Sequence, residues 1–227
     1  MIGDSHAHTA YPGMSEILRE RNVNTVLFAN TACPTFLGAE YGRTEEIKLG
    51  CRRSIEQIID VVAAKSDIRK VFIFTRGPLY VDGTGFGDVE RYVDGQHLIG
   101  PQVFKASLQA TIDTLSKAGK QIFYVTENPE IGRLPAGCIA RPFRLIPKDC
   151  SIDRTSVLDR QREYLEVVNS TQGATIVNSL GVFCPSDRCL AVSDGWLLYA
   201  DSNHLSVAGS RFQAARLLDR YLVATER

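Results

Sequence analysis

The sequence has no excess of charge of either sign, because 26 Lys and Arg residues balance 26 Asp and Glu residues. A nucleic acid or an anionic membrane surface is therefore not favoured as the main partner. Long apolar runs are also missing, and none approaches the roughly 18 residues that a membrane span requires. No stretch at the start has the layout of a signal peptide. With 227 residues, the default expectation is one domain with a sizeable core.

Short apolar runs alternate with longer amphipathic stretches, a pattern that predicts strands alternating with helices. The short runs are rich in Val and Ile, as in strands that helices cover on both faces. We therefore predict an α/β fold, a three-layer α/β/α sandwich around a five-stranded parallel sheet. The expected strands are Met1–Asp4, Thr25–Ala29, Lys70–Thr75, Gln121–Thr126 and Thr175–Asn178. The expected helices cover about Ser15–Arg21, Thr44–Ala64, Gln102–Ala118, Arg154–Thr171 and Ser206–Val223.

Two segments between these elements are long. Gly77–Gly100 is rich in Gly, and Asn128–Asp153 is rich in Pro and holds two cysteines. Loops of this length inside a compact domain are usually functional or disordered. Because Gly77–Gly100 follows a predicted strand end, it can border a site, although a plain surface loop fits equally well.

Ser5 follows a short apolar start and a Gly-Asp pair, the layout of a strand that ends in a tight turn. In open α/β sheets, sites form beyond the carboxyl ends of the strands. A hydroxyl is a weak nucleophile until a neighbouring base takes its proton. His204 can supply that base, and Asp201, three residues earlier and just before the last predicted helix, can orient it. Ser5, His204 and Asp201 together fit the logic of a Ser-His-Asp triad.

Four motifs occur together in this chain: Gly3-Asp4-Ser5-His6-Ala7, Ala32-Cys33-Pro34, Cys184-x4-Cys189 and Tyr199-Ala200-Asp201-Ser202-Asn203-His204-Leu205-Ser206. Together they resemble the SGNH/GDSL superfamily of esterases and acyltransferases. The likeness narrows to the extracytoplasmic SGNH domains fused to acyltransferase-family-three membrane proteins, which O-acetylate bacterial surface polysaccharides. It spans essentially the whole chain and implies a flavodoxin-like SGNH hydrolase fold with strand order 2-1-3-4-5.

The resemblance implies Ser-dependent transfer of an acyl group, most simply acetyl, to a surface polysaccharide through an acyl-enzyme on Ser5. No cofactor is implied beyond an acyl donor. A carbohydrate acetyl esterase with the same triad is the alternative, because the two reactions differ only in the acceptor. The implied location is periplasmic or otherwise extracytoplasmic. Because Met1 lies so close to Ser5, we expect residues 1–227 to be a single domain cut from a longer protein, with an upstream acyltransferase domain that tethers it to the inner membrane.

The predicted oxyanion hole departs from the superfamily pattern. Members usually have a Gly after the second strand and an Asn after the third, and this chain has neither at those places. The Ser5 backbone N–H is one expected donor. The further candidates are Asn30, the backbone N–H of Ala32 or Cys33, and Arg76. For Arg76, a plain ion pair at the sheet edge is equally consistent.

Six cysteines allow 15 pairings, and we predict that each bonds with its nearest neighbour in sequence because each such pair brackets a loop. Such disulfides indicate an oxidising compartment. Six reduced thiols in a cytosolic enzyme are the alternative. A zinc site is less favoured, because no pair has the Cys-x2-Cys spacing. The predicted pairs are Cys33–Cys51, Cys138–Cys150 and Cys184–Cys189.

Two rival functions use the same residues. His6 and His8 at alternate strand positions would share a face and could bind zinc, as in metal-dependent amidohydrolases. Only His97 and His204 remain as further histidines, and such barrels typically need eight strand–helix units, whereas we predict five. A non-catalytic carbohydrate-binding module is the other rival, against which the complete Ser5, Asp201 and His204 set argues.

Four further side chains near these motifs have mainly structural expectations. His6 is expected to point away from Ser5 in an extended segment and to bond the loop beneath the site. Asp4 is expected to form the turn. Trp196 and Tyr199 can stack on a sugar, but we expect at least one of them to be buried.

Overall fold

The computed structural model describes residues 1–87, 99–140, 142 and 145–221. Its central sheet has five parallel strands in the order β2-β1-β3-β4-β6. Numbered along the chain, that order is 2-1-3-4-5, so the predicted α/β fold and topology are confirmed. The strands are β1 (Ile2–Gly3), β2 (Phe28–Ala29), β3 (Lys70–Phe74), β4 (Gln121–Val125) and β6 (Ala174–Val177).

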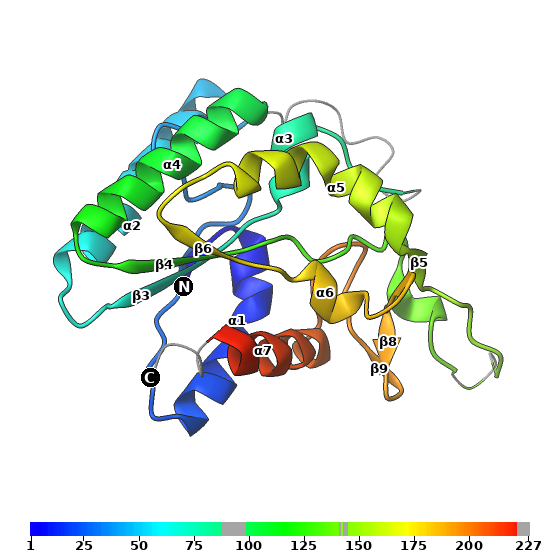
Figure 1. Ribbon diagram of the computed structural model, residues 1–227. Helices are drawn as coiled ribbons and strands as arrows, with labels where there is room; N and C mark the ends of the chain where they lie inside the picture. Colours follow the sequence, from blue (N-terminus) through cyan, green and yellow to red (C-terminus); the bar gives the residue numbers. More distant parts are fainter. Residues whose placement is uncertain (88–98, 141, 143–144, 222–227) are drawn as a thin grey trace.

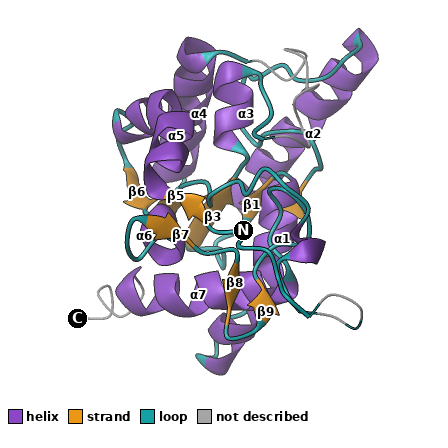
Figure 2. Ribbon diagram, turned by 90° about the vertical axis from the view of Figure 1, so that its right-hand side faces the viewer, coloured by secondary structure: helices purple, strands orange, loops and turns teal. Residues whose placement is uncertain are grey.

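Helices cover both faces of this sheet, which makes the three layers visible in Figures 1 and 2. One layer contains α2, α4 and α5, and the other contains α1 and α7. Their bounds are α1 (Ser5–Glu20), α2 (Glu45–Ala64), α4 (Pro101–Lys117), α5 (Arg154–Asn169) and α7 (Val207–Tyr221).

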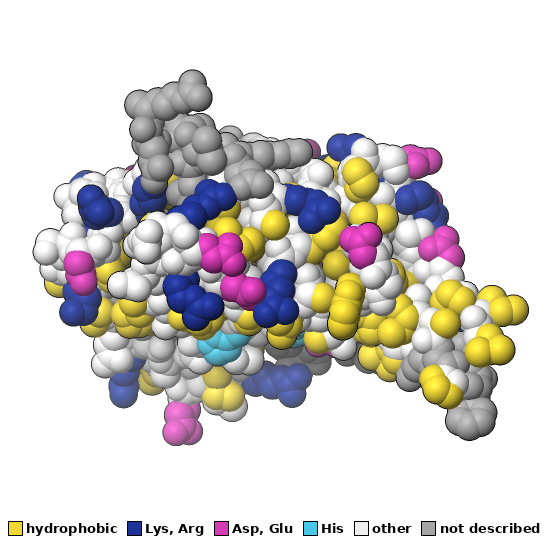
Figure 3. Space-filling view, turned by 90° about the horizontal axis from the view of Figure 1, so that it is seen from below, with side chains coloured by type: hydrophobic (Ala, Val, Ile, Leu, Met, Phe, Trp, Pro, Cys, Tyr) yellow, Lys and Arg dark blue, Asp and Glu magenta, His cyan; other side chains and the backbone are white. Residues whose placement is uncertain are grey.

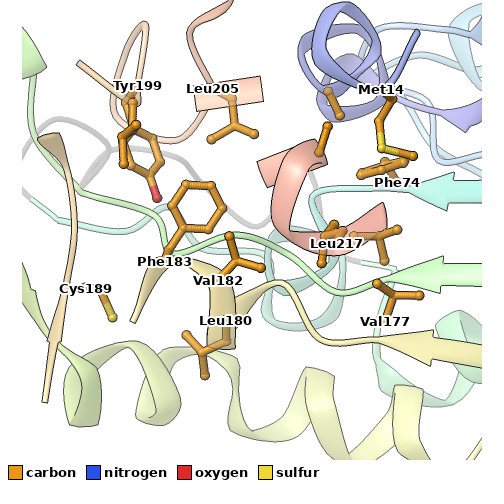
Figure 4. Packing of buried hydrophobic residues seen from close by; sticks show 14 of the residues in the cluster. Met14, Phe74, Val177, Leu180, Val182, Phe183, Cys189, Tyr199, Leu205 and Leu217 are labelled. Atoms are coloured by element: carbon orange, nitrogen blue, oxygen red, sulfur yellow. The ribbon is translucent and has the colours of Figure 1, made fainter. Parts of the chain in front are cut away.

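The core consists of two clusters, one on each face of the sheet. Successive side chains of a strand point to opposite faces, and β3 shows this directly. Val71 and Ile73 pack with α2 and α4, whereas Phe72 and Phe74 pack with α1 and α7. Figure 4 shows Phe74 beside Met14 of α1, with Leu217 of α7 close by. Both faces of β3 are therefore buried, as its continuous apolar sequence predicts.

The first helix begins at Ser5, ten residues earlier than predicted. Asp4 caps it, because its side chain accepts a hydrogen bond from the backbone N–H of His6. Pro12 and Gly13 are poor helix formers and hide the helical pattern in the sequence. Ser5 is consequently the first residue of a helix, and His6 lies in its first turn instead of in an extended segment.

The predicted loop Gly77–Gly100 is shorter than expected, because α3 (Gly77–Asp82) occupies its start. Pro78 lies in the first turn of α3, where its missing N–H costs nothing, and Gly83 ends the helix with a φ of 75°. Residues 88–98, which include His97, lie outside the described part of the chain.

The second long segment, Asn128–Asp153, contains a 3-10 turn, Pro135–Gly137, and ends in a short strand. Two small antiparallel pairs, β5 with β7 and β8 with β9, form separate sheets outside the central one. The remaining elements are β5 (Ile152–Asp153), α6 (Leu180–Phe183), β7 (Arg188–Cys189), β8 (Val192–Ser193) and β9 (Trp196–Leu197).

Three disulfides join the cysteines that were expected to pair: Cys33–Cys51, Cys138–Cys150 and Cys184–Cys189. The first fastens the loop after β2 to α2. The second closes the Pro-rich segment on itself, and the third joins the end of α6 to β7. Each restricts a segment that contributes little regular structure of its own, which lowers the entropy of the unfolded chain.

Basic and acidic side chains are interspersed on the face that carries α1 and α7, as Figure 3 shows. This agrees with the balanced composition of the chain. Within the described residues, none of the helices combines the length and the apolar character that crossing a membrane requires.

Candidate active site

The carboxyl ends of the central strands bring polar residues together at one edge of the sheet, where sites of α/β proteins form. Asp4 and Ser5 follow β1, Arg76 lies two residues after β3, and Glu127 lies two residues after β4. The loop before α7 brings His204 to the same edge, because α7 packs against α1, which begins at Ser5.

Ser5, His204 and Asp201 form a continuous chain of hydrogen bonds. The Ser5 Oγ lies 2.8 Å from His204 Nε2, and His204 Nδ1 lies 2.7 Å from Asp201 Oδ2. With Nδ1–H donating to the carboxylate, Nε2 is free to accept the proton of the Ser5 hydroxyl. These distances are those of a Ser-His-Asp triad. The side chains of His204 and Asp201 are partly exposed, so a substrate can approach them.

The Asp201 carboxylate shapes its own loop. Its Oδ1 accepts hydrogen bonds from the backbone N–H groups of Asn203 and His204, at 2.9 and 2.7 Å. Asp commonly holds a turn in this way, which explains the three-residue spacing of Asp201 and His204. Partial burial alone would raise the pKa of Asp201, but the hydrogen bonds from the His204 side chain and from these N–H groups outweigh it. They hold the pKa well below its usual range, so the carboxylate is ionised at neutral pH.

Asp4 has a larger role than forming a turn. Its carboxylate is fully buried and accepts three hydrogen bonds, from the backbone N–H of His6, the backbone N–H of Arg76 and the Tyr80 hydroxyl. The Tyr80 bond is 2.7 Å long, and burial together with the Asp4 charge raises the pKa of Tyr80 well above its usual value. Asp4 thereby joins the start of α1 to the end of β3 and to α3.

His6 lies in the first turn of α1 and is buried against the loop that carries His204. Its Nδ1 lies 3.0 Å from the Glu127 carboxylate, and its Nε2 lies 3.1 Å from Asn203 Oδ1. The ring centroid is 4.7 Å from that of His204, with an interplanar angle of 37°. The expected bond to the loop beneath the site is therefore present, although the backbone of His6 is helical.

Several of the Arg76 donors already have partners. Its backbone N–H bonds Asp4, and its Nε and Nη2 bond the buried Glu130 carboxylate at 2.8 and 2.5 Å. Arg160 pairs with the other oxygen of Glu130 at 2.7 Å. The two guanidinium groups outweigh the effect of burial and lower the pKa of Glu130. This geometry is that of a structural ion-pair network.

The other oxyanion candidates lie at the end of β2. The Cys33 N–H donates to the Asn30 carbonyl, which removes it from the candidates. Ala32 is exposed, and its φ of 55° lies in the left-handed region, so its backbone forms a turn and is not extended. The Ser5 N–H belongs to the first residue of a helix, where backbone N–H groups have no partner within the helix.

Of the two aromatic residues before Asp201, one is buried and one is not. Tyr199 is buried and packs with its ring centroid 5.9 Å from that of Phe183. Trp196 at the tip of the β8–β9 hairpin has 69% of its surface exposed. The expectation that at least one is buried is therefore met.

The zinc interpretation of the first histidines is wrong for this fold. His6 and His8 lie on a helix, not on alternate positions of a strand, and the sheet is open instead of a barrel. His6 is buried whereas His8 is exposed. Within the described ranges, no three His, Cys, Asp or Glu side chains are grouped so that they could hold a metal ion.

Glu127 and Glu130 were missed by the sequence analysis. Both are buried, although Glu is almost never fully buried without a partner. One signal was present, because Glu127 directly follows the predicted strand Gln121–Thr126 and so ends at the same sheet edge as Ser5.

Comparisons with known proteins agree with this geometry. The family model described as SGNH domain (fused to AT3 domains) matches residues 1–219. No curated protein is significantly similar in sequence. A solved structure of the lipopolysaccharide acetyltransferase periplasmic domain of Salmonella ser. Paratyphi A is similar, with a TM-score of 0.67 at 14% identity, over 98% of this chain and 82% of that one. A putative acylhydrolase from Bacteroides fragilis NCTC 9343 has a TM-score of 0.51 at 9% identity, over 100% of this chain and 86% of that one.

Proposed function

The chain belongs to the family of SGNH domains fused to AT3 domains, which makes it an esterase or acyltransferase, and we propose that it transfers an acyl group to a hydroxyl of a bacterial surface polysaccharide. The proposed group is acetyl. The observation that carries the proposal is the hydrogen-bonded chain from Ser5 through His204 to Asp201.

In the proposed reaction, His204 Nε2 takes the proton of the Ser5 hydroxyl while Oγ attacks the acyl carbonyl. Asp201 holds the imidazole by its Nδ1–H and stabilises the imidazolium that forms. When the tetrahedral intermediate collapses, His204 returns the proton to the departing group of the donor, and the acyl group remains on Ser5. The acceptor hydroxyl then repeats the sequence, since His204 takes its proton and gives it back to Ser5 Oγ.

The tetrahedral intermediate carries a negative oxygen that needs hydrogen-bond donors. The Ser5 backbone N–H at the start of α1 is the proposed first donor, and the positive end of the helix dipole adds to it. Ala32 and Asn30 are the proposed sources of a second donor. Arg76 is a weaker candidate, because Glu130 already binds two of its side-chain nitrogens.

The proposed acceptor is a carbohydrate and not water. The family description supports transfer over hydrolysis, because its SGNH domains are fused to AT3 domains, which are acyltransferases. The exposed indole of Trp196, on the hairpin that leads to Asp201, offers an apolar face on which a sugar ring can stack. The acyl group is proposed to come from the membrane domain, so that no cofactor beyond this donor is required.

The proposed location is extracytoplasmic, with the membrane domain as the tether. Three disulfides support it, because disulfides persist in oxidising compartments.

An acetyl-transfer assay with a chromogenic acetyl ester tests the proposal. Acetylated glycan should form when polysaccharide is added, and Ser5→Ala should remove both transfer and hydrolysis by several orders of magnitude with an unchanged melting temperature. Trp196→Ala should raise the KM for glycan while hydrolysis of the ester stays the same. Hydrolysis with no glycan product would favour the esterase, and a Ser5→Ala variant that keeps more than about a tenth of the activity would refute the nucleophile.

A further inference from the structure

A buried ion pair lies directly behind the candidate base. His6 and Glu127 are 4% and 2% exposed, and His6 Nδ1 lies 3.0 Å from Glu127 Oε1. The other ring nitrogen, Nε2, donates to Asn203 Oδ1 at 3.1 Å. The Asn203 amide oxygen can only accept, so Nε2 carries a proton. With a second proton on Nδ1, His6 is an imidazolium that faces the Glu127 carboxylate.

The groups that face His6 determine its charge. They are Glu127 after β4, Asp4 before α1, Arg76 after β3, and the His204 ring at 4.7 Å. Burial alone would lower the pKa of His6, but the Glu127 carboxylate, with help from Asp4 and against Arg76, raises it to about 9. His6 is therefore protonated at neutral pH, and it loses its proton as the pH rises through about 9.

His6 also connects the two segments that the reaction must align. It is the neighbour of Ser5 on α1, and its partner Asn203 is the neighbour of His204. The Asn203 backbone N–H donates to Asp201 Oδ1 at 2.9 Å, and its carbonyl accepts from Asn128 Nδ2 at 3.0 Å. The contact between His6 and Asn203 thus fixes the loop of the base on the helix of the nucleophile.

We propose that His6 and Glu127 are positioning residues, whose ion pair holds Asn203 and with it the Asp201–His204 loop at the distance from Ser5 that proton transfer needs. This rests on the proposed function of Ser5. A neutral His6 has a single N–H, so one of its two acceptors then faces a lone pair and is repelled. Loss of the His6 proton therefore loosens the loop, whereas the fold retains its two hydrophobic clusters.

Glu127→Gln is the first test, because it keeps the size of the side chain and removes its charge. The expected result is a loss of roughly 10- to 100-fold in kcat for ester hydrolysis, the scale of a misplacement of about 1 Å, with an unchanged KM. In the wild type, kcat should fall above pH 9. In the variant that alkaline limb should move down by at least about one pH unit, since the partner that raises the pKa of His6 is gone.

Glu130→Gln is the matched control. It also removes a buried carboxylate from an ion pair three residues away, but its partners are Arg76 and Arg160 instead of His6. It should lower the melting temperature and leave the alkaline limb in place. His6→Gln should have a low kcat, and its kcat should not fall further near pH 9.

A second measurement needs no substrate. In a sample with 15N-labelled histidine, both ring nitrogens of His6 should have the NMR shifts of protonated nitrogens at pH 7.5, and should titrate at the pH of the kinetic limb. A His6 that is neutral at pH 7.5, or a limb that Glu127→Gln leaves unmoved, overturns the proposal. If Glu127→Gln does not fold, the wild type alone decides. A difference between the pH midpoint of the His6 NMR titration and the pH at which kcat falls overturns the proposal. An active Ser5→Ala variant refutes the proposed function instead and leaves the NMR result standing.

Discussion

Gly13→Ala should lower both the stability of the protein and its kcat, although Ala is a better helix former than Gly. Gly13 lies in α1 where α7 crosses closely, and its N–H donates to Ser210 Oγ at 2.8 Å. A Cβ at this position would lie 2.3 Å from the backbone C and O of Ser210. Nonbonded carbon atoms prefer roughly 3.5–4.0 Å, so α7 has to retreat by about 1 Å or more.

The expected size follows from two opposing effects. The substitution gains up to about 1 kcal/mol in helix propensity. Forcing atoms into a packed contact costs about 1–3 kcal/mol, occasionally more, and the weakened bond to Ser210 costs about 1 kcal/mol further. The net loss is about 1–3 kcal/mol, which lowers Tm by roughly 2–12 °C in a chain of this size.

Activity should fall with stability, because α1 begins at Ser5 and α7 follows the His204 loop. A displacement of about 1 Å between the two should lower kcat by roughly 10²-fold. The control is Gly50→Ala in α2, where an added Cβ has no atom within 4 Å. It should raise stability by about 0.5–1 kcal/mol and leave kcat unchanged. Thermal melts and ester kinetics on both variants test this expectation. If Gly13→Ala keeps the stability and kcat seen in Gly50→Ala, the close packing of α1 against α7 does not position the site.

Three further changes test other parts of the structure. Asp201→Asn should lower kcat by about 10⁴-fold with little change in KM, because the amide stabilises the wrong tautomer of His204. Since the folded chain lowers the pKa of Asp201, the wild-type activity should not fall near neutral pH through protonation of this group. The stability that the Asp201 carboxylate contributes should be lost only as the pH falls below about 4. Arg76→Ala should cost about 1.5–3 kcal/mol in urea unfolding, because Glu130 then loses one of its two arginine partners. A loss of 10²-fold in kcat with unchanged stability would instead make Arg76 an oxyanion donor. Reducing Cys33–Cys51, which closes a separation of 18 residues, should cost about 3 kcal/mol, and free thiols found in the folded, non-reduced protein would contradict the disulfide assignment.

The sequence predicted the parts of the fold that depend on local pattern. The five strands, their parallel order and four of the five long helices follow from apolar periodicity and from the family resemblance. Ser5, Asp201 and His204 were selected because each lies beside a strand end or a helix start, and the structure brings them together.

The missed features depend on contacts between distant segments. The start of α1 was hidden, because Gly13 is explained by its close approach to Ser210 of α7, almost 200 positions later. Arg76 looked available as a donor until Glu130 was placed beside it. Glu127 is ordinary in sequence, and only its burial against His6 makes it a candidate for a role. No local pattern contains these pairings.

The central claim is that an acyl group is held on Ser5 during turnover, and rapid acid quenching tests it most directly. The protein is mixed with a chromogenic acetyl ester, quenched within milliseconds and digested for peptide mass spectrometry. The account predicts one acetyl group on the peptide that contains Ser5, formed before the steady state and absent from Ser5→Ala. Turnover without acetylation of that peptide, or with acetyl on another residue, would contradict it.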